Sequence, residues 1–560
     1  MTPTNLAVDR RTLLAAGAVG AAALTSVDMT AAQAAARYFR HGVASGDPRP
    51  HSVILWTRVT PSDDATPGSG RGRRVTVRWQ VAKDAAFRDV VARGSFSTGP
   101  SRDHTVKVDA TGLKPATRYH YRFLYDGVAS RTGRTLTAPA EKADNRRLRF
   151  GVVSCANLQA GWFSPYRHLA DRDDLDAVLH LGDYFYEYGP GEYGYGFSNE
   201  DIRKHQPTHE IVSLADYRQR HAQYKTDVDL QRLHAKVPFI ATWDDHEVTN
   251  DQWRNGAENH QPETEGDYRE RKLRAHRAYD EWMPVRMGGT TRIGDGDRLY
   301  RRLRFGRLME LSMLDLRSYR SQQVQGAVTP VPSPDPEISD PDRTITGNGQ
   351  MEWLKESLRN GRALWKVVGN PVMIAPVVFP PLPTEVLANV QDVAGLYPED
   401  GLPYNVDQWD GYTADRHELF GHLRDHGVQN AVFLTGDIHS AWACDLPVDA
   451  GTYPASETVG TEFVCTSVTS NNLKDITGSP ARTTSLAVEA GIQTANRHVK
   501  YLNFDDHGYS VVDITRERLQ MDYFIISDRA EKRATATRTA SWATTVNSQK
   551  VHTVQKGIDG

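Results

Sequence analysis

The sequence predicts an α/β fold preceded by a small all-β domain, and two patterns along the chain lead to that prediction. Residues 38–140 contain short alternating, β-branched runs separated by Gly, Pro and Asp, a spacing typical of a β-sandwich. Residues 148–528 instead contain continuous apolar runs of strand length, with helical stretches between them. The 560 residues are enough for three to four domains at about 150 residues each, so both units fit the length.

Composition excludes several other classes of protein. The 67 basic and 70 acidic side chains give a net charge of −3, which argues against a general nucleic-acid binder. Charged residues at 24% and aromatic residues at 9% exclude a mostly disordered chain. Three cysteines are too few for a disulfide framework. We therefore expect a soluble monomer with no nucleic-acid partner and no stable membrane span.

The first 34 residues have the pattern of an export signal. Arg10-Arg11 precede the weakly apolar stretch 15–24, and Ala32-Gln33-Ala34 offers the small residues that a signal peptidase requires. The paired arginines resemble a twin-arginine signal. We expect residues 1–34 to be removed as the protein is secreted, to the medium or cell wall, by the twin-arginine machinery. The alternative is an ordinary amphipathic helix, which the lack of acidic residues between Arg11 and Leu24 disfavours.

Four runs in the all-β region are predicted strands: 52–59, 75–81, 105–108 and 119–124. Residues 113–119 resemble the tyrosine corner of fibronectin-type sandwiches, in which the phenol hydrogen bonds back to the preceding corner. We expect this sandwich to pack against the main domain as a support rather than to bind a ligand. The polar stretch 141–147 is the expected linker.

Six apolar runs define the main domain: 150–154, 177–181, 238–242, 308–314, 365–368 and 431–434. Helices are expected at 164–170 and 414–425, and further strands at 509–514 and 519–526. Residues 529–560 are low in apolar content, so we expect a C-terminal tail that frays or packs back over the site. Two long connections, 321–349 and 379–412, are expected to frame a cleft.

Four of these apolar runs end in polar clusters: Cys155-Ala156-Asn157, Gly182-Asp183-Tyr184-Phe185-Tyr186, Trp243-Asp244-Asp245-His246-Glu247 and Gly436-Asp437-Ile438-His439. Parallel strands bring their carboxyl ends to one edge of a sheet, where ligands bind in open α/β folds. One such cluster is often only a polar turn, but four together predict a metal site. Carboxylates suit calcium, magnesium, manganese or ferric iron, whereas thiolate and imidazole prefer a softer metal. The mixture predicts two unlike metals, which Asp183 could bridge.

The order and spacing of these clusters resemble the PhoD-type alkaline phosphatases and phosphodiesterases of the calcineurin-like metallophosphatase superfamily. The resemblance covers nearly the whole chain, including the leader, the sandwich and an entry segment at 39–48. It implies a catalytic domain with a two-sheet core flanked by helices, an αββα arrangement. It also implies ferric iron, Fe(3+), held by Cys155, Asp183, Tyr186 and His439. Calcium, Ca(2+), is implied near Asp183, Asp245 and Asp437, with room for a second calcium close by.

Two cations would polarise a phosphoryl group and supply a metal-bound hydroxide for in-line attack on phosphorus. His246 is the expected catalytic residue, since it can hydrogen bond the phosphoryl group or protonate the leaving oxygen; alternatively, it only supports Asp245. We therefore expect an alkaline phosphatase that hydrolyses phosphate monoesters. The alternatives are a phosphodiesterase or phospholipase D-type enzyme acting on lipid or cell-wall polymer diesters, and a non-catalytic binding protein with a structural metal.

Three questions stay open at the level of sequence. Asn370 follows an apolar strand and could supply one more oxygen ligand, while Asp244 has no assigned role. Arg317 and Arg320 could bind phosphate or form a buried ion pair. Cys444 and Cys465 could form a disulfide or remain two free thiols.

Overall fold

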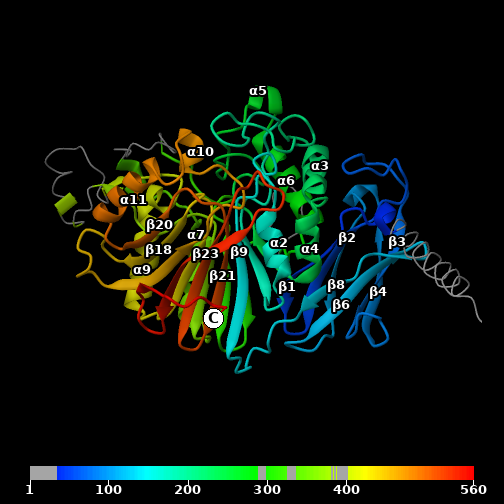
Figure 1. Ribbon diagram of the computed structural model, residues 1–560, viewed down its shortest axis with the longest axis horizontal. Coiled ribbons are helices and arrows are strands. Elements are labelled where there is room, and N and C mark those ends of the chain that lie inside the picture. The colour runs from blue at the N-terminus through cyan, green and yellow to red at the C-terminus, as the bar shows by residue number, and fades with distance from the viewer. Residues whose placement is uncertain are drawn as a thin grey trace, which may run out of the picture.

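A computed structural model describes residues 35–287, 298–324, 336–379, 383, 386–387 and 401–559. The expected export signal, residues 1–34, lies outside the described residues, and so do parts of both long connections. Figure 1 shows the N-terminal strands (blue) gathered at one end of the molecule, beside the larger α/β part of the chain.

The larger of two central sheets runs in the order β24-β23-β22-β21-β9-β10-β11-β1-β2-β5. Its central strands β9 (Arg147–Val153), β10 (Ala177–Leu181) and β11 (Phe239–Thr242) are parallel. On one side the sheet continues through antiparallel strands: β21 (Gly508–Thr515), β22 (Arg518–Ile526), β23 (Ala536–Thr545) and β24 (Val551–Thr553). The parallel centre places the carboxyl ends of β9, β10 and β11 at the same edge.

The second central sheet runs in the order β12-β13-β14-β17-β19-β18-β20. Its strands are β12 (Arg301–Phe305), β13 (Met309–Met313), β14 (Trp365–Asn370), β17 (Ala431–Thr435), β18 (Ala441–Pro447), β19 (Thr458–Val464) and β20 (Val499–Asn503). Strands β13, β14, β17 and β19 are parallel to one another. Apolar side chains of both sheets, among them Phe150, Leu179, Leu311 and Val432, form one core between the sheets. Burial on both faces explains why these strands are continuous apolar runs.

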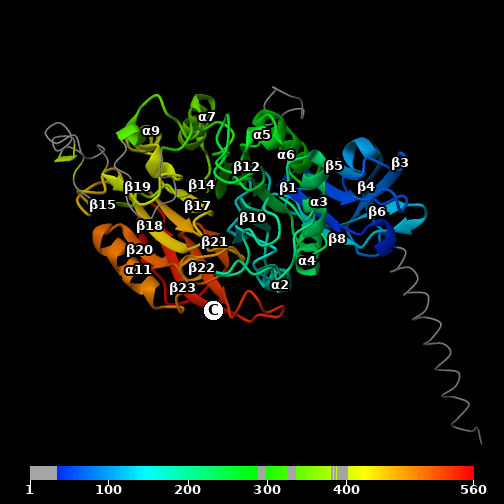
Figure 2. The ribbon, with the colours of Figure 1, turned by 90° about the horizontal axis from the view of Figure 1, so that it is seen from above.

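Helices cover the outer face of each sheet. Those that pack on the larger sheet are α2 (Ser164–Asp171), α3 (Leu214–Tyr224), α4 (Val228–Lys236) and α6 (Tyr268–Trp282). Those that pack on the second sheet are α7 (Asn348–Asn360), α9 (Thr413–Asp425) and α11 (Thr484–Ala495). Figure 2 shows successive layers of α7 and α9, then β14 and β17, then β21 and β22. The αββα prediction is therefore confirmed.

Shorter elements complete the α/β part: α5 (Pro262–Glu265), α10 (Leu473–Thr477), β15 (Val378–Phe379) and β16 (Leu402–Pro403). Local sequence sets the ends of the helices. Helix α3 begins with a capping box, in which Ser213 Oγ accepts from Asp216 N and the Asp216 carboxylate accepts from Ser213 N. Among the residues described, no helix has both the length and the apolar character needed to cross a bilayer.

The N-terminal region is a sandwich, as predicted. One of its sheets contains β3 (Val75–Ala82), β4 (Val90–Thr98), β6 (Arg118–Tyr125), β7 (Val128–Ala129) and β8 (Gly133–Leu136). The facing strands are β1 (Val43–Arg49), β2 (Ser52–Arg58) and β5 (Thr105–Thr111). Both layers share one apolar core, which includes Leu55, Val77 and Tyr121. Tyr119 Oη accepts a hydrogen bond from Lys114 N at 2.9 Å, which confirms the tyrosine corner.

The sandwich is not a separate body joined only through the linker. Strand β1 pairs in parallel with β11 at Gly46 and Phe239, so the β1-β2-β5 layer extends the larger sheet. A Cβ at position 46 would lie 2.1 Å from Pro284 O, so only glycine allows this close approach. The α/β part and the sandwich therefore share a backbone hydrogen-bond ladder.

The prediction of a C-terminal tail from residue 529 is wrong. Strands β23 and β24 belong to the larger sheet, and Arg172 forms an ion pair with Asp559 at 2.6 Å. The error has a physical cause: residues 536–540 of β23 are half-buried or exposed, so this part of the strand needs few apolar residues.

Candidate metal centre

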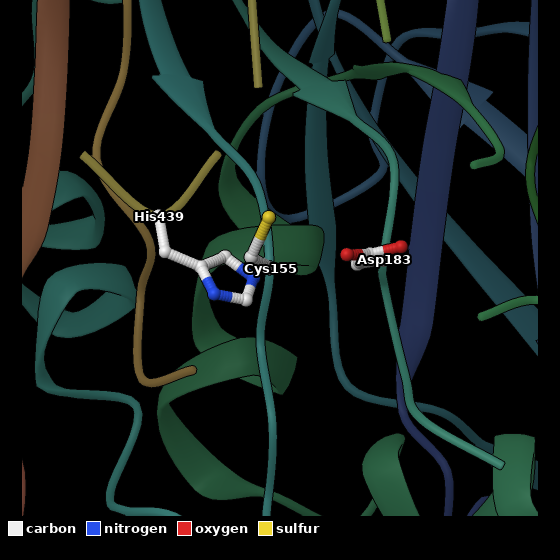
Figure 3. A group of neighbouring side chains, drawn as sticks. All are labelled: Cys155, Asp183 and His439. Atoms are coloured by element: carbon white, nitrogen blue, oxygen red, sulfur yellow. The ribbon is translucent and has the colours of Figure 1, made fainter. Parts of the chain in front are cut away.

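The four predicted polar clusters meet at the carboxyl edges of the two sheets. Strand β9 leads to Cys155, β10 to Asp183, β11 to the Asp244-Asp245 pair, and β17 to Asp437 and His439. Ligand atoms of Cys155, Asp183 and His439 all lie within 4.8 Å of one another (Figure 3). Carboxylates of Asp183, Asp244, Asp245 and Asp437 form a second group within the same distance. Asp183 belongs to both groups, as a bridging ligand must.

The backbone at this edge is held in an uncommon conformation. Four of the expected ligands have left-handed φ angles: Cys155 (+58°), Asp183 (+53°), Asp437 (+65°) and His439 (+53°). Such conformations cost roughly 1–3 kcal/mol and persist where the surroundings enforce them, most often at functional sites. Gly182, with φ +113°, makes the sharp turn into Asp183, and a Cβ there would lie 2.5 Å from Asp244 Cβ.

A thiol, a phenol and an imidazole line one side of Asp183. Tyr186 Oη donates to Asp183 Oδ2 at 2.9 Å and lies 3.2 Å from His439 Nε2. His439 Nδ1 donates to Asn471 O at 2.7 Å, which leaves the lone pair on Nε2 facing the group. Burial lowers the pKa of His439 to about 4, so the ring is neutral, as a metal ligand must be. Burial raises the pKa of the Cys155 thiol, and the charge on Asp183 adds to that rise.

The other side of Asp183 carries an excess of carboxylates. Burial raises the pKa of Asp183, and the charges on Asp245 and Asp244 raise it further against the opposing effect of His246. Burial also raises the pKa of Asp437, and the charge on Asp244 is the next largest cause of that rise. Asp183 Oδ1 is buried with no hydrogen-bond partner in the described part of the chain. A cation would neutralise these buried carboxylates and give Asp183 Oδ1 a partner, so the residues present fit a metal centre.

Arg317 neutralises part of the acidic group. Its buried guanidinium binds Asp244, with Nε 2.5 Å from Oδ1 and Nη2 2.9 Å from Oδ2. It also lies 3.7 Å from Asp245 and 3.6 Å from Asp437. Of the two possibilities open for this arginine, the structure therefore shows the buried ion pair, and Asp244 is its main partner.

Glu247 ties the second and third clusters together. Its Oε2 accepts from Asp183 N at 3.1 Å and Asp244 N at 2.8 Å, and its Oε1 accepts from Tyr184 N at 2.6 Å. Burial raises the pKa of Glu247 to about 8. These three backbone contacts fix the turn that directs Asp183 towards the other ligands.

A ring nitrogen of His246 lies within 4.8 Å of carboxylate oxygens of Asp183 and Asp245. Its Nδ1 lies 2.7 Å from Glu187 Oε2. Burial alone would lower the pKa of His246, but the carboxylates of Asp245, Glu187 and Asp183 outweigh it and raise that pKa well above its usual range. Its ring also packs against Tyr186, with centroids 4.0 Å apart. The imidazole hydrogen bonds to Glu187, and the backbone N–H of His246 donates to Asp245 Oδ1 at 2.9 Å.

The remaining open residues lie outside both ligand groups. Asn370 donates through Nδ2 to Val372 O at 2.6 Å and accepts through Oδ1 from Trp409 Nε1 at 3.2 Å. Both ends of its amide therefore hydrogen bond to residues outside the ligand groups. All three cysteines are free and buried, so Cys444 and Cys465 form no disulfide.

Glu187 was missed by reasoning from the sequence. Its place directly after Tyr186, at the end of a polar cluster, was an available signal. Its four hydrogen-bond donors give it a fixed position: the side chains of His246, Thr249 and Asn259, and the backbone N–H of Asn250.

Comparisons with known proteins agree with this geometry. A family model described as "PhoD-like phosphatase" matches residues 150–523, and one described as "PhoD-like phosphatase, N-terminal domain" matches residues 23–139. Alkaline phosphatase D of Bacillus subtilis (strain 168) is 36% identical over 505 residues, which are 90% of this chain and 80% of that protein. A solved structure titled "Structure of PhoD" has a TM-score of 0.82 and 34% identity, and the match covers 93% of each chain.

Proposed function

Because the chain belongs to the PhoD-like phosphatase family and is a phosphoric ester hydrolase, we propose that it hydrolyses phosphate monoesters at a centre of ferric iron and calcium. The observation that carries this proposal is the pair of ligand groups that share Asp183. One group offers a thiol and an imidazole, whereas the other offers only carboxylates, so the two positions favour different metals.

The proposed iron ligands are Cys155, Asp183, Tyr186 and His439, and the proposed calcium ligands are Asp183, Asp245 and Asp437. The anionic thiolate and phenolate suit a trivalent iron, and the carboxylate oxygens suit calcium. When bound, the two cations would polarise the phosphoryl oxygens and activate a water for in-line attack on phosphorus.

His246 is the proposed general acid of the reaction. Its Nδ1 is engaged by Glu187, which leaves the proton on Nε2 for the oxygen of the leaving group. Cations at the centre would neutralise Asp183 and Asp245, so Glu187 is the carboxylate that keeps the ring protonated. Contact with the Tyr186 ring fixes the plane of the imidazole.

The decisive experiment combines metal analysis of the purified protein with a paired assay on a chromogenic phosphate monoester and the corresponding diester. We expect bound iron and calcium, faster turnover of the monoester, and loss of activity on calcium chelation that added calcium reverses. Faster turnover of the diester would identify a phosphodiesterase instead. No turnover of either ester by metal-replete protein would favour a binding protein.

We also propose that the protein is exported through the twin-arginine machinery and acts outside the cytoplasm. Arg10-Arg11 before a weakly apolar stretch supports this proposal, since that route carries folded proteins. The proposed metal ligands come from distant parts of the chain, so metals would be bound only after folding. A route that exports folded proteins therefore suits this protein. Fractionation of cells that express wild type or an Arg10→Lys/Arg11→Lys variant tests the proposal, because the variant should stay inside the cell. Equal export of both proteins would contradict it.

A further inference from the structure

A short segment between β19 and α10, residues 469–472, contacts two proposed iron ligands through its backbone. The amides of Thr469 and Ser470 both donate to Cys155 O at 3.3 Å. Asn471 O accepts from His439 Nδ1 at 2.7 Å. All four residues of the segment are buried. It therefore supports ligands from two different strand ends, β9 and β17.

The side chain of Ser470 contacts a third ligand. Its hydroxyl oxygen lies 2.7 Å from Tyr186 Oη and 2.9 Å from Cys155 O. A serine hydroxyl has a single proton, so it donates fully to one of these acceptors at a time. The Tyr186 phenol meanwhile directs its own proton to Asp183 Oδ2.

We propose that Ser470 is a positioning residue that donates a hydrogen bond to the Tyr186 oxygen and orients this side chain as an iron ligand. This inference rests on the proposed function, in which Tyr186 is an iron ligand. As an iron ligand Tyr186 would be a phenolate, whose oxygen only accepts hydrogen bonds. The Ser470 hydroxyl would then donate its hydrogen bond to that charged oxygen rather than to Cys155 O, since charge-assisted hydrogen bonds are roughly twice as strong as neutral ones. Cys155 O keeps the two amides of the segment as donors.

The segment is anchored well enough to hold this hydroxyl in place. The buried guanidinium of Arg529 donates to Thr469 O and, at 2.6 Å, to Asn471 Oδ1, and it forms an ion pair with Asp475 at 2.9 Å. His507 Nε2 donates to Ser470 O at 2.9 Å. Ser470 is therefore oriented before any metal binds, which is the arrangement that lets an outer contact tune a ligand.

The test compares Ser470→Ala with a matched control, Ser467→Ala, in the full-length protein. Ser467 lies just before the segment, is equally buried and donates to Ser470 O at 2.8 Å, so the control removes a neighbouring hydroxyl without touching a ligand side chain. Two properties are measured: the dissociation constant for iron, and the wavelength of the phenolate-to-iron absorption band. Ser470→Ala should bind iron about 10–100-fold more weakly and shift the band to longer wavelength, because the phenolate loses its donor. Ser467→Ala should match wild type.

A third variant, Ser470→Cys, keeps a weak donor and should fall between wild type and Ser470→Ala in both measurements. Wild-type affinity and wavelength in Ser470→Ala would overturn the role of Ser470 while leaving the iron site intact. Equal shifts in Ser470→Ala and Ser467→Ala would also overturn it, because the cause would then be the fold of the segment. Failure of the iron site itself would be visible in wild type, as folded protein with neither bound iron nor an absorption band.

Discussion

Asp183 and Tyr184 are neighbours in the chain, but their side chains enter two buried clusters of opposite character. Asp183 enters the acidic cluster, which consists of Asp183, Asp244, Asp245 and Asp437. Tyr184 enters what we call the lysine cluster, which consists of Lys225, His41, His180, His221 and His234. Lys225 is 1% exposed and lies 3.1 Å from His234 Nε2, with no ion pair to a carboxylate in the described residues.

The two clusters respond to burial in different ways. Burial lowers the pKa of Lys225 well below its ordinary value of 10.5, and it lowers the pKa of each histidine in the cluster. Burial therefore favours the neutral form of each of these groups, and a neutral cluster needs no ligand to balance a charge. The rings of Trp56 and Tyr184, 4.7 and 5.1 Å from Lys225 Nζ, offset part of the cost of a charge but supply no counter-ion.

The difference shows what marks a ligand site in this molecule. Both clusters are buried and rich in titratable groups, so burial alone does not identify function. Only the acidic cluster combines converging ligand atoms with left-handed backbone at Asp183 and Asp437. Within the described residues, the lysine cluster has neither feature. Convergence and backbone strain together are therefore the stronger indication.

The largest effect is expected from Asp183→Asn, which removes the carboxylate shared by both ligand groups. We expect loss of both metals and a fall in kcat/KM of at least about 1,000-fold, since the cations supply several kcal/mol of transition-state stabilisation. Metal analysis and steady-state kinetics measure both. A metal-replete, active Asp183→Asn protein would remove the functional distinction between the clusters.

The next effect concerns Glu187→Gln, which keeps the shape of the side chain that orients His246 but removes its charge. We expect kcat to fall about 10–100-fold with metal content unchanged. Loss of the Glu187 charge lowers the pKa of His246, so the alkaline limb of the pH–rate profile should move to lower pH. An unchanged profile would mean that another group donates the proton.

A smaller effect, a gain in stability rather than a loss of activity, is expected from Lys225→Met in the lysine cluster. Burial sets the folded-state pKa of Lys225 well below 10.5, so between that pKa and pH 10.5 the unfolded chain binds more protons at Lys225 than the folded protein does. Wild-type stability therefore falls as the pH falls through this window. The variant should be more stable by about 1 kcal/mol at neutral pH, and this gain should vanish above pH 10.5. Thermal unfolding at several pH values measures the difference, and activity should stay unchanged. Destabilisation at neutral pH would show that the aromatic rings hold a charged lysine.

An effect on stability alone is expected outside both clusters, at the tyrosine corner of the sandwich. Tyr119→Phe removes one hydrogen bond to Lys114 N and should cost about 1 kcal/mol of stability. Chemical denaturation measures the loss, and metal content serves as the control. Any loss of iron in this variant would show that the sandwich influences the metal centre from a distance.

Much of the fold could be predicted because buried parallel strands leave continuous apolar runs. The predicted strand at 177–181 matches β10 without change, and the helix predicted at 414–425 matches α9 to within one residue. Strand β23 leaves a weaker pattern because its first half is largely exposed to water, which is why the C-terminus was misjudged.

The side chains that converge on the centre were also predictable, since each follows an apolar strand. The groups that orient them were not. Ser470 lies in a loop with no periodic pattern, and its contact with Tyr186 depends on how two sheets meet. Arg529 lay in the region expected to be a tail, yet it anchors that loop. Such contacts arise only from tertiary structure, so a single sequence does not reveal them.

The position of β23 and β24 at the end of the larger sheet has a consequence for the order of events during synthesis. Arg149 of β9 forms ion pairs with Asp513 and Asp559, residues made long after β9 has left the ribosome. The sheet that carries Cys155 and Asp183 therefore cannot be completed while the chain is still growing through its middle. We expect folding of this domain to be largely post-translational, so premature stop codons that remove β23 and β24 should yield misfolded, rapidly degraded protein.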